Sequence, residues 1–247
     1  MKESYLKDKF ACRILSDENT REFLYEMVSK VLNVPNEEIR KDFRLIDFKV
    51  GNSIDTKNSE TDVSILSKEG YINIEVNYNY SKALSEKNMN YICNLYVKQI
   101  GRGSKYEIKP IYQINIDNYD LYGKGEIIYK SILQEAKYKI EYPNNKIAIY
   151  DINMEKIKEI EYNKLKKGSI EYLLYFFICN DTDLLKEIYV GDKKMEKVVE
   201  KIDDMEEVWP ESLYYNKDEF VKMSIQESQK EKAYNEGKEA GKIEGKL

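Results

Sequence analysis

Apolar and polar residues alternate along two short segments in the first third of the chain, which is the pattern of β-strands with two different faces. The segments are residues 61–66, TDVSIL, and residues 72–77, INIEVN. Between them lies Ser-Lys-Glu-Gly at 67–70, a turn composition that ends in glycine, where a positive φ is often needed. The pattern therefore predicts a β-hairpin.

A four-residue loop determines the register of this hairpin. It places Leu66 opposite Tyr71, and counting outward brings Asp62 opposite Glu75. Side chains alternate between the two faces of a strand, so one face is expected to be apolar and the other to carry acids and amides. The apolar face would hold Val63, Ile65, Ile72, Ile74 and Val76, and the polar face Asp62, Ser64, Asn73, Glu75 and Asn77. A register shift of one residue would mix apolar and polar side chains on each face of the hairpin, so the pattern supports this pairing.

Hydrophobic periodicity predicts further helices and strands on both sides of the hairpin. A helix is expected from Thr20 to Leu32, with Phe23, Met27 and Val31 as its buried stripe. The other expected elements are a helical turn at 35–41, strands at 43–50, 111–116, 126–139 and 146–152, and helices at 87–100, 168–180 and 193–207. Periodicity alone thus indicates a mixed α/β class.

The composition is that of a folded chain. Of its 247 residues, 42% are hydrophobic and 22 are tyrosine, enough for one substantial core or one core with a smaller appendage. No stretch approaches the roughly 20 apolar residues that span a bilayer. The start, MKESYLKDKF, lacks the apolar core of a signal peptide. We therefore expect a cytoplasmic protein with no membrane partner.

The absence of histidine excludes much common chemistry. A Ser/His/Asp or Cys/His catalytic system of the usual type cannot form. The three cysteines, Cys12, Cys93 and Cys179, are isolated, so we expect them to pack rather than to bind zinc. No GxxxxGK[ST] phosphate loop is present either. The pair Asp62 and Glu75 is then the best indication of chemistry.

Two carboxylates that face each other directly across a sheet have Cβ atoms about 5 Å apart and repel each other. A hard divalent cation such as Mg²⁺ or Mn²⁺, which prefers oxygen ligands, would compensate for this repulsion. The alternative is a polar, solvated sheet face on which two acids happen to be opposite. The spacing by itself leaves both interpretations open.

The net charge of −5 argues against non-specific coating of DNA, which relies on lysine and arginine. Cations nevertheless gather in one stretch just after the hairpin, with two tyrosines among them. These residues are Lys82, Lys87, Lys98, Arg102, Lys105 and Lys109, with Tyr91 and Tyr96. They would suit a phosphate track with stacking rings, or else an ordinary solvated surface.

Asp62, the hairpin turn, and Glu75 with Asn77 two positions later resemble the D…(D/E)-x-K signature of the PD-(D/E)XK nucleases. The resemblance is closer to the branch of Rpn-type recombination-promoting nucleases and PD-(D/E)XK family transposases, where the last position is commonly glutamine. It extends along most of the chain. Residues 6–32 are similar to the family's opening helical region, 57–62 to its lead-in, 87–99 to the next helix, 106–115 to the following strand and 236–246 to its repetitive tails.

The resemblance implies a role for each of the three motif residues. Asp62 and Glu75 would ligate the metal, Mg²⁺ or Mn²⁺, and all three would be catalytic. Asn77 lies roughly 6.5 Å from Glu75 along the same face and would position the attacking water or the phosphate. A neutral amide only forms hydrogen bonds, whereas a lysine would also stabilise charge. In many relatives a glutamate of the first helix joins the metal; here Glu22 and Glu26 share a helix face, and both also fit as surface acids.

The resemblance also implies an architecture. The fold would be α/β with a restriction-endonuclease-like core, a mixed central sheet flanked by helices, and a helical C-terminal region. Residues 1–165 would form the nuclease-like domain, 166–222 the helical region, and 223–247 a charged tail. In that tail Gly237, Gly241 and Gly245 recur every four residues, which allows either close association of helices between copies of the chain or a frayed tail.

The function expected from the resemblance is that of a metal-dependent DNA endonuclease of the recombination-promoting, transposase-associated type, with DNA and a divalent metal as partners. The alternative is a binding or scaffold protein that keeps the nuclease fold without catalysis. Asn77, the net negative charge and the glycine-spaced tail motivate that alternative.

Overall fold

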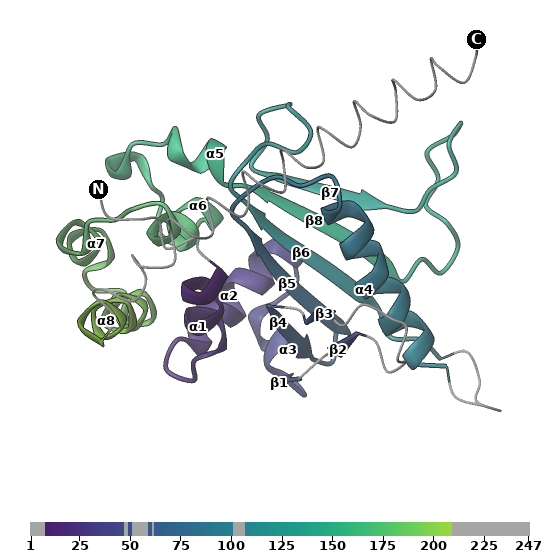
Figure 1. Cartoon of the computed structure of the whole chain (residues 1–247), viewed down its shortest axis with the longest axis horizontal. Helices are drawn as coiled ribbons and strands as arrows, with labels where there is room; N and C mark the ends of the chain where they lie inside the picture. The colour runs from purple at the N-terminus through teal and green to yellow at the C-terminus, as the bar shows by residue number, and fades with distance from the viewer. Residues whose placement is uncertain (1–7, 47–48, 51–58, 61, 101–106, 209–247) are drawn as a thin grey trace, which may run out of the picture. The chain divides into compact units, whose positions relative to one another are not determined.

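The computed structural model describes residues 8–46, 49–50, 59–60, 62–100 and 107–208 (Figure 1). The chain divides into two compact units, Met1–Lys201 and Ile202–Leu247. The sheet and the site described below belong to the first unit. The glycine-spaced tail predicted at 223–247, and with it the predicted association of helices between copies, lies outside the described residues. The predicted domain boundary at residue 165 stays a prediction.

The centre of the first unit is a six-stranded mixed sheet in the order β1-β4-β5-β6-β8-β7 (Figure 1). The strands are β1 (Arg44–Leu45), β4 (Val63–Leu66), β5 (Tyr71–Asn77), β6 (Ile111–Asp117), β7 (Ile128–Ile132) and β8 (Ile147–Asn153). Strands β5, β6 and β8 run parallel, and the other neighbours pair antiparallel. A separate two-stranded ladder joins β2 (Lys49–Val50) and β3 (Ser59–Glu60). The predicted mixed α/β class is thereby confirmed.

Helices precede, interrupt and follow the sheet. They are α1 (Asp8–Ser16), α2 (Arg21–Leu32), α3 (Asn36–Arg40), α4 (Leu84–Lys98), α5 (Met154–Lys158), α6 (Ile170–Leu174), α7 (Thr182–Tyr189) and α8 (Lys193–Val208), with single 3₁₀ turns η1 (Tyr162–Lys164) and η2 (Tyr175–Phe177). Helix α1 packs against β4 and β5, and α2 packs against α3 and α6. The predicted stripe of α2 is confirmed, since Phe23, Met27 and Val31 are buried. No helix in the described ranges is long and apolar enough to cross a membrane.

The predicted register of the hairpin is confirmed. Leu66 pairs with Tyr71, Ile65 with Ile72, and Val63 with Ile74. Gly70 has φ +141°, and a Cβ atom there would lie 2.2 Å from the carbonyl oxygen of Pro110, so the end of the turn requires glycine.

Two predicted elements are shorter than expected. The strand predicted at 126–139 ends at Ile132, and beyond it only an isolated bridge joins Gln134 to Glu141. Leu133 and Tyr138, apolar residues of the segment beyond Ile132, are exposed. Apolar and polar residues alternate there as in a strand, but the segment covers no sheet face. The strand predicted at 43–50 is likewise replaced by the two-residue strands β1 and β2.

The helix predicted at 168–180 is broken into α6 and η2. A buried tyrosine of α7, an element that the periodicity did not predict, explains the break. The Tyr189 hydroxyl donates to the carbonyl of Tyr172 and accepts from the amide of Phe176, at 2.9 and 3.1 Å. It therefore occupies both backbone groups that an α-helical i to i−4 bond would have joined.

Helix α4 covers one face of the parallel strands and divides it into two chemically different ends. Apolar residues of α4, such as Tyr91 and Leu95, pack on Ile111 and Ile147 at the beginnings of β6 and β8. Towards the carboxyl ends of the strands, this face becomes polar. In register, Glu75 pairs with Asn115 and Asn115 with Asp151, while Asn77 pairs with Asp117 and Asp117 with Asn153. The first turns of α4 lie over this polar end, where ligands of open parallel sheets commonly bind.

Candidate functional site

The hairpin brings Asp62 and Glu75 into a shared hydrogen-bond arrangement. Asp62 lies immediately before β4, and its amide donates to Glu75 Oε1 at 3.3 Å. The Asp62 carboxylate in turn accepts from the amide of Val76 at 2.8 Å. The two acids are therefore neighbours across the hairpin, as the register predicted.

The polar face of the hairpin is not solvated. Glu75 is only 1% exposed, and Ser64, Asn73 and Asn77 on the same face are also buried. The interpretation of this face as a solvated surface is therefore wrong. Buried carboxylates need specific compensation, because removing a charge from water costs several kcal/mol.

The electrostatics of the pair reflect this burial. Burial and the neighbouring charge of Asp62 raise the pKa of Glu75 to about 7, against the opposing influence of Lys87. Burial also raises the pKa of Asp62, although the hydrogen bond from the Val76 amide opposes the shift. The structure thus holds two acids that resist being ionised together, as expected for a site that would bind a cation.

A lysine from α4 supplies part of the compensation. Lys87 Nζ lies 2.7 Å from Glu75 Oε2, and the Lys87 side chain is 37% exposed. Burial disfavours the Lys87 ammonium, but the charge of Glu75 and the hydrogen bond to it prevail, so the pKa of Lys87 is raised. Lys87 is therefore a stable cation near neutral pH, suited to stabilising negative charge rather than to accepting a proton.

Sequence reasoning placed Lys87 in a surface track and did not assign it to the acid pair. The available signal was the motif itself: Asn77 occupies the usual lysine or glutamine position, so a cation would have to come from another element. Lys87 is in the first turn of the following helix. Only the placement of that helix over the sheet shows that Lys87 reaches Glu75.

Asn77 lies on the same face of β5 as Glu75, but its side chain forms a hydrogen bond with a different acid. Its Nδ2 donates to Asp117 Oδ1 at 2.9 Å. Asn115 similarly donates to Asp151 Oδ1 at 2.7 Å. Burial raises the pKa of Asp117 to about 7 and also raises the pKa of Asp151. Sequence reasoning missed this second group of polar residues, because their alternation on β6 and β8 is also that of an ordinary strand.

Glu22 and Glu26, the two glutamates of the first helical region, form ion pairs with basic residues of other helices. Glu22 forms an ion pair with Arg40 of α3. Glu26 lies 3.1 Å from Lys194 of α8. These ion pairs agree better with the interpretation of both residues as surface acids than with a role beside Asp62.

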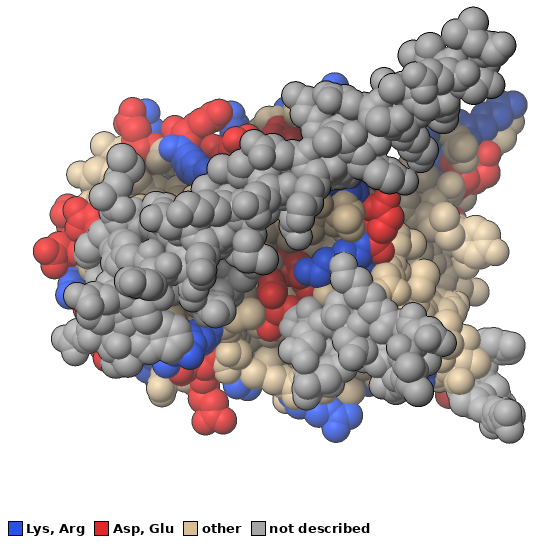
Figure 2. All heavy atoms as spheres, viewed as in Figure 1, with Lys and Arg blue, Asp and Glu red and all other residues tan. Residues whose placement is uncertain are grey.

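The structure supports only part of the predicted phosphate track. Tyr91 is fully buried, with the Lys87 ammonium 5.5 Å from its ring centre, so its expected role in base stacking is wrong. Arg102 and Lys105 lie outside the described residues. On the face seen in Figure 2, the described acidic and basic side chains are interspersed and form no single basic patch. Of the described lysines of the track, Lys87 is the one that contacts the acid pair, through Glu75.

The cysteines differ in their environments. Cys179 is buried, as the packing interpretation requires, whereas Cys93 is exposed, so for Cys93 that interpretation is wrong. Cys12 of α1 is half-buried, and its thiol donates to the carbonyl oxygen of Asp62 at 3.3 Å. This contact helps to hold the residue that begins the site.

The donor set at Asp62 and Glu75 suits a hard divalent cation. No group of three or more acids, cysteines or histidines gathers anywhere in the described ranges, so the protein alone offers no closed metal cage. Mg²⁺ commonly binds through one or two carboxylates and completes its shell with water and substrate phosphates. Two adjacent carboxylates with raised pKa values, Glu75 buried and Asp62 partly buried, meet that requirement.

The raised pKa of Glu75 predicts how the stability of the metal-free protein depends on pH. Between about 4.5 and 7 the folded state binds more protons at Glu75 than the unfolded state, so the free energy of unfolding falls as the pH rises. Above pH 7 this penalty reaches about 3 kcal/mol. Urea denaturation in EDTA at pH 5 and pH 8 measures the difference.

The same experiment has an internal control on α4. Glu75→Gln should reduce this pH dependence by the contribution of Glu75 and leave that of Asp117, whose pKa is also about 7, whereas Glu86→Gln, at an exposed position of α4, should leave it unchanged. A stability that stays constant or increases from pH 5 to pH 8 in the wild type would contradict the raised pKa.

A comparison with known families agrees with the fold. A family model described as PD-(D/E)XK nuclease family transposase matches residues 9–232. The six-stranded mixed sheet with flanking helices is consistent with the restriction-endonuclease-like core of that family. No curated protein matches the chain.

Proposed function

The chain belongs to the PD-(D/E)XK nuclease family transposases, and from this membership we propose that it is a metal-dependent DNA endonuclease of the recombination-promoting type. The observation that carries this proposal is the pair of the partly buried Asp62 and the buried Glu75, with the Lys87 ammonium 2.7 Å from Glu75. Two acids and one cation, gathered near the carboxyl end of β5, suit the hydrolysis of a phosphodiester.

Asp62 and Glu75 are the residues that would hold the divalent ion, Mg²⁺ or Mn²⁺. When bound, such an ion supplies a Lewis acid that polarises the phosphate and makes water more acidic. The hydrogen bond from the Val76 amide keeps the Asp62 carboxylate in place, and the Asp62 amide does the same for Glu75. Preorganised ligands reduce the cost of arranging the site at the moment of reaction.

Lys87 is assigned to the phosphate. Because its pKa is raised, it stays protonated and offers a positive charge beside the acids as negative charge grows on the phosphate oxygens. Its partial exposure leaves room for the ammonium to turn from Glu75 towards a bound strand. Lys87 would thereby take over the electrostatic task that a motif lysine performs in relatives.

Asn77 is assigned the positioning role that its place in the motif indicates. Its amide nitrogen is bonded to Asp117, so the side chain is held in one orientation beside the acid pair. The amide is neutral and can only donate or accept hydrogen bonds to water or phosphate. The site therefore relies on Lys87, rather than Asn77, for positive charge.

Cleavage of DNA by the purified full-length chain tests the proposal. We expect nicking or linearisation of supercoiled plasmid with Mg²⁺ or Mn²⁺, and complete loss of cleavage in excess EDTA that is reversed by adding either ion back. Agarose gel electrophoresis measures the conversion. Absence of cleavage with both ions on supercoiled, linear and single-stranded DNA would refute the proposal.

A second candidate function is that of a nuclease-fold binding or scaffold protein without catalysis. It is favoured by one observation: Asn77, at the position of the usual lysine or glutamine, is committed to Asp117. Calorimetry distinguishes the two functions. A competent site binds Mg²⁺ or Mn²⁺ and loses that binding on Glu75→Gln, whereas the scaffold shows no specific metal binding.

A further inference from the structure

Buried acids and amides alternate across the three parallel strands in two neighbouring rows. In register across β5, β6 and β8, the first row is Glu75, Asn115 and Asp151, and the second is Asn77, Asp117 and Asn153. All six side chains are buried. The proposed mechanism uses Glu75 and Asn77 but assigns no role to the acids on β6 and β8.

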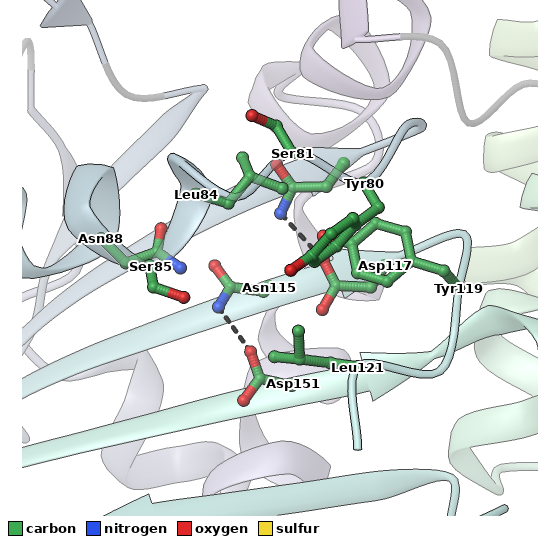
Figure 3. A pocket seen from close by; sticks show the side chains of 11 residues that line it. Tyr80, Ser81, Leu84, Ser85, Asn88, Asn115, Asp117, Tyr119, Leu121 and Asp151 are labelled. Atoms are coloured by element: carbon green, nitrogen blue, oxygen red, sulfur yellow. Dashed lines mark hydrogen bonds between the residues drawn. The ribbon is translucent and has the colours of Figure 1, made fainter. Parts of the chain in front are cut away.

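In the first row, both ends of the Asn115 amide are bonded to protein. Asn115 Nδ2 donates to Asp151 Oδ1 at 2.7 Å, and Asn115 Oδ1 accepts from Gln113 Nε2 at 3.0 Å. Figure 3 shows the hydrogen bond to Asp151 as a dashed line. Because protein groups occupy both of its ends, the Asn115 amide serves to hold the polar face of the sheet together.

In the second row, only the nitrogen end of the Asn77 amide is bonded to protein. Asn77 Nδ2 donates to Asp117 Oδ1 at 2.9 Å. No donor of the described residues is bonded to Asn77 Oδ1, and this oxygen is not among their fully buried polar atoms that lack a partner, of which Asn88 Oδ1 is one. Asn77 Oδ1 is therefore an acceptor that water can reach.

Asp117 determines which end of the Asn77 amide faces β6. It is 2% exposed and also receives a hydrogen bond from the Tyr119 side chain, which lies beside it in Figure 3. Burial and the charge of Asp117 raise the pKa of the Tyr119 hydroxyl, so Tyr119 keeps its proton. A reversed Asn77 amide would place its oxygen against an oxygen of Asp117, and neither atom has a proton to share. The carboxylate thus selects one orientation of the amide.

The order of the strands gives the direction of the Asn77 oxygen. Strand β5 lies between β4 and β6, and Asp117 is on β6. The nitrogen end of the amide is turned towards β6, so the oxygen end faces away from β6. Asp62 lies on that opposite side, immediately before β4, and Glu75 is two residues away on the same face of β5. Asn77 therefore offers an acceptor oxygen to the region of the acid pair.

We propose that Asp117 is a positioning residue that keeps the Asn77 oxygen turned towards the acid pair, where it accepts a hydrogen bond from water. Water bound to a cation turns its hydrogens outward, so an acceptor fixed nearby stabilises and orients it. The inference rests on the proposed function in placing a divalent ion at Asp62 and Glu75. It adds that Asn77 acts through its oxygen, a role that a lysine, which has only donors, could not fill.

Calorimetric titration of the full-length chain with Mg²⁺ tests this coupling without DNA. It is done at pH 8, above the pKa of about 7 of Asp117. Asn77→Leu and Asp117→Leu should each weaken Mg²⁺ binding about tenfold. The double variant should also lose about tenfold rather than a hundredfold, because both substitutions remove the same oriented acceptor. Asp117→Asn keeps an oxygen that accepts from Asn77 and should restore most of the affinity.

An exchange of the two side chains distinguishes an acceptor from a donor. Asn77→Asp combined with Asp117→Asn reverses the hydrogen bond but still turns an oxygen towards the acid pair. The exchanged protein should bind Mg²⁺ at least as tightly as the wild type and retain cleavage, whereas a site that needs an N–H group at position 77 would lose cleavage. Asp183→Leu, at an exposed position of α7, is the control for the leucine variants and should retain the wild-type affinity.

The outcomes separate this inference from the nuclease activity. Unchanged Mg²⁺ affinity in the folded leucine variants, a hundredfold loss in the double variant, or loss of cleavage in the folded exchange variant would overturn the inference and leave the proposed function standing. Coupled losses of affinity in a protein that never cleaves would support the inference and refute the activity. Circular dichroism confirms folding, and the exchange variant, which keeps the hydrogen bond, decides the question if a leucine variant is unstable.

Discussion

Glu75→Gln is expected to reduce metal-dependent DNA cleavage about a thousandfold while the protein remains folded. The substitution keeps the shape of the side chain but removes the charge that would hold the metal, and metal catalysis contributes several kcal/mol. Glu75 is 1% exposed and has a raised pKa even beside Lys87, so its ionised form is costly in the absence of a bound metal ion. The neutral variant should therefore be at least as stable as the wild type at pH 8 in EDTA.

Single-turnover cleavage rates with Mg²⁺, together with Mg²⁺ titration in a calorimeter, measure this effect. Asp62→Asn should behave in the same way, because the two carboxylates form one site. Glu86→Gln, at an exposed position of the first turn of α4, is the matched control and should retain the wild-type rate. Cleavage by Glu75→Gln at the wild-type rate would remove Glu75 from the mechanism.

Lys87→Met should lower the cleavage rate about a hundredfold, the usual effect of removing one group that stabilises charge in a transition state. Methionine retains much of the apolar stem, so the packing of α4 over the sheet should persist. The ammonium lies 2.7 Å from Glu75 and has a raised pKa, and both observations assign it an electrostatic role. Lys87→Arg keeps the charge and should restore part of the rate.

The pH profile distinguishes this role from that of a general base. A lysine that acts as a base would produce a rate that rises with pH as the ammonium loses its proton. A cationic Lys87 predicts that the wild type and Lys87→Met have the same pH dependence between pH 7 and pH 9, at different absolute rates. Lys156→Met removes a lysine from an exposed ion pair, 2.6 Å from Glu159, and should leave the rate unchanged. If Lys87→Met cleaves as fast as that control, Lys87 has only a structural role.

The hairpin could be predicted from the sequence because its determinants are local. Two alternating segments and a turn that ends at Gly70 allow one register that keeps apolar residues together, and the observed pairing of Val63 with Ile74 agrees with it. The stripe of α2 was predictable for the same reason. The strand prediction failed for the exposed residues after Ile132, which alternate as a strand does, because alternation does not reveal whether a partner strand is present.

Other features depend on residues that are distant in the sequence. The break between α6 and η2 comes from the hydroxyl of Tyr189, thirteen positions after the amide that it accepts from. Burial of Glu75 on a face that looked suited to solvent comes from α4, whose first turn also brings Lys87. The amides of Asn77 and Asn115 are fixed by Asp117 and Asp151 only when β5, β6 and β8 align.

The sequence by itself determined that Asp62 and Glu75 would meet, because strand alternation and one glycine turn act over a few residues. It also determined the family resemblance, through the spacing of the motif. The tertiary structure decided what surrounds the acids: their burial and raised pKa values, the cation from α4 in place of a motif lysine, and the hydrogen bond from Asn77 to Asp117. These properties depend on distances between separate elements in three dimensions, which the packing of α4 on three parallel strands establishes.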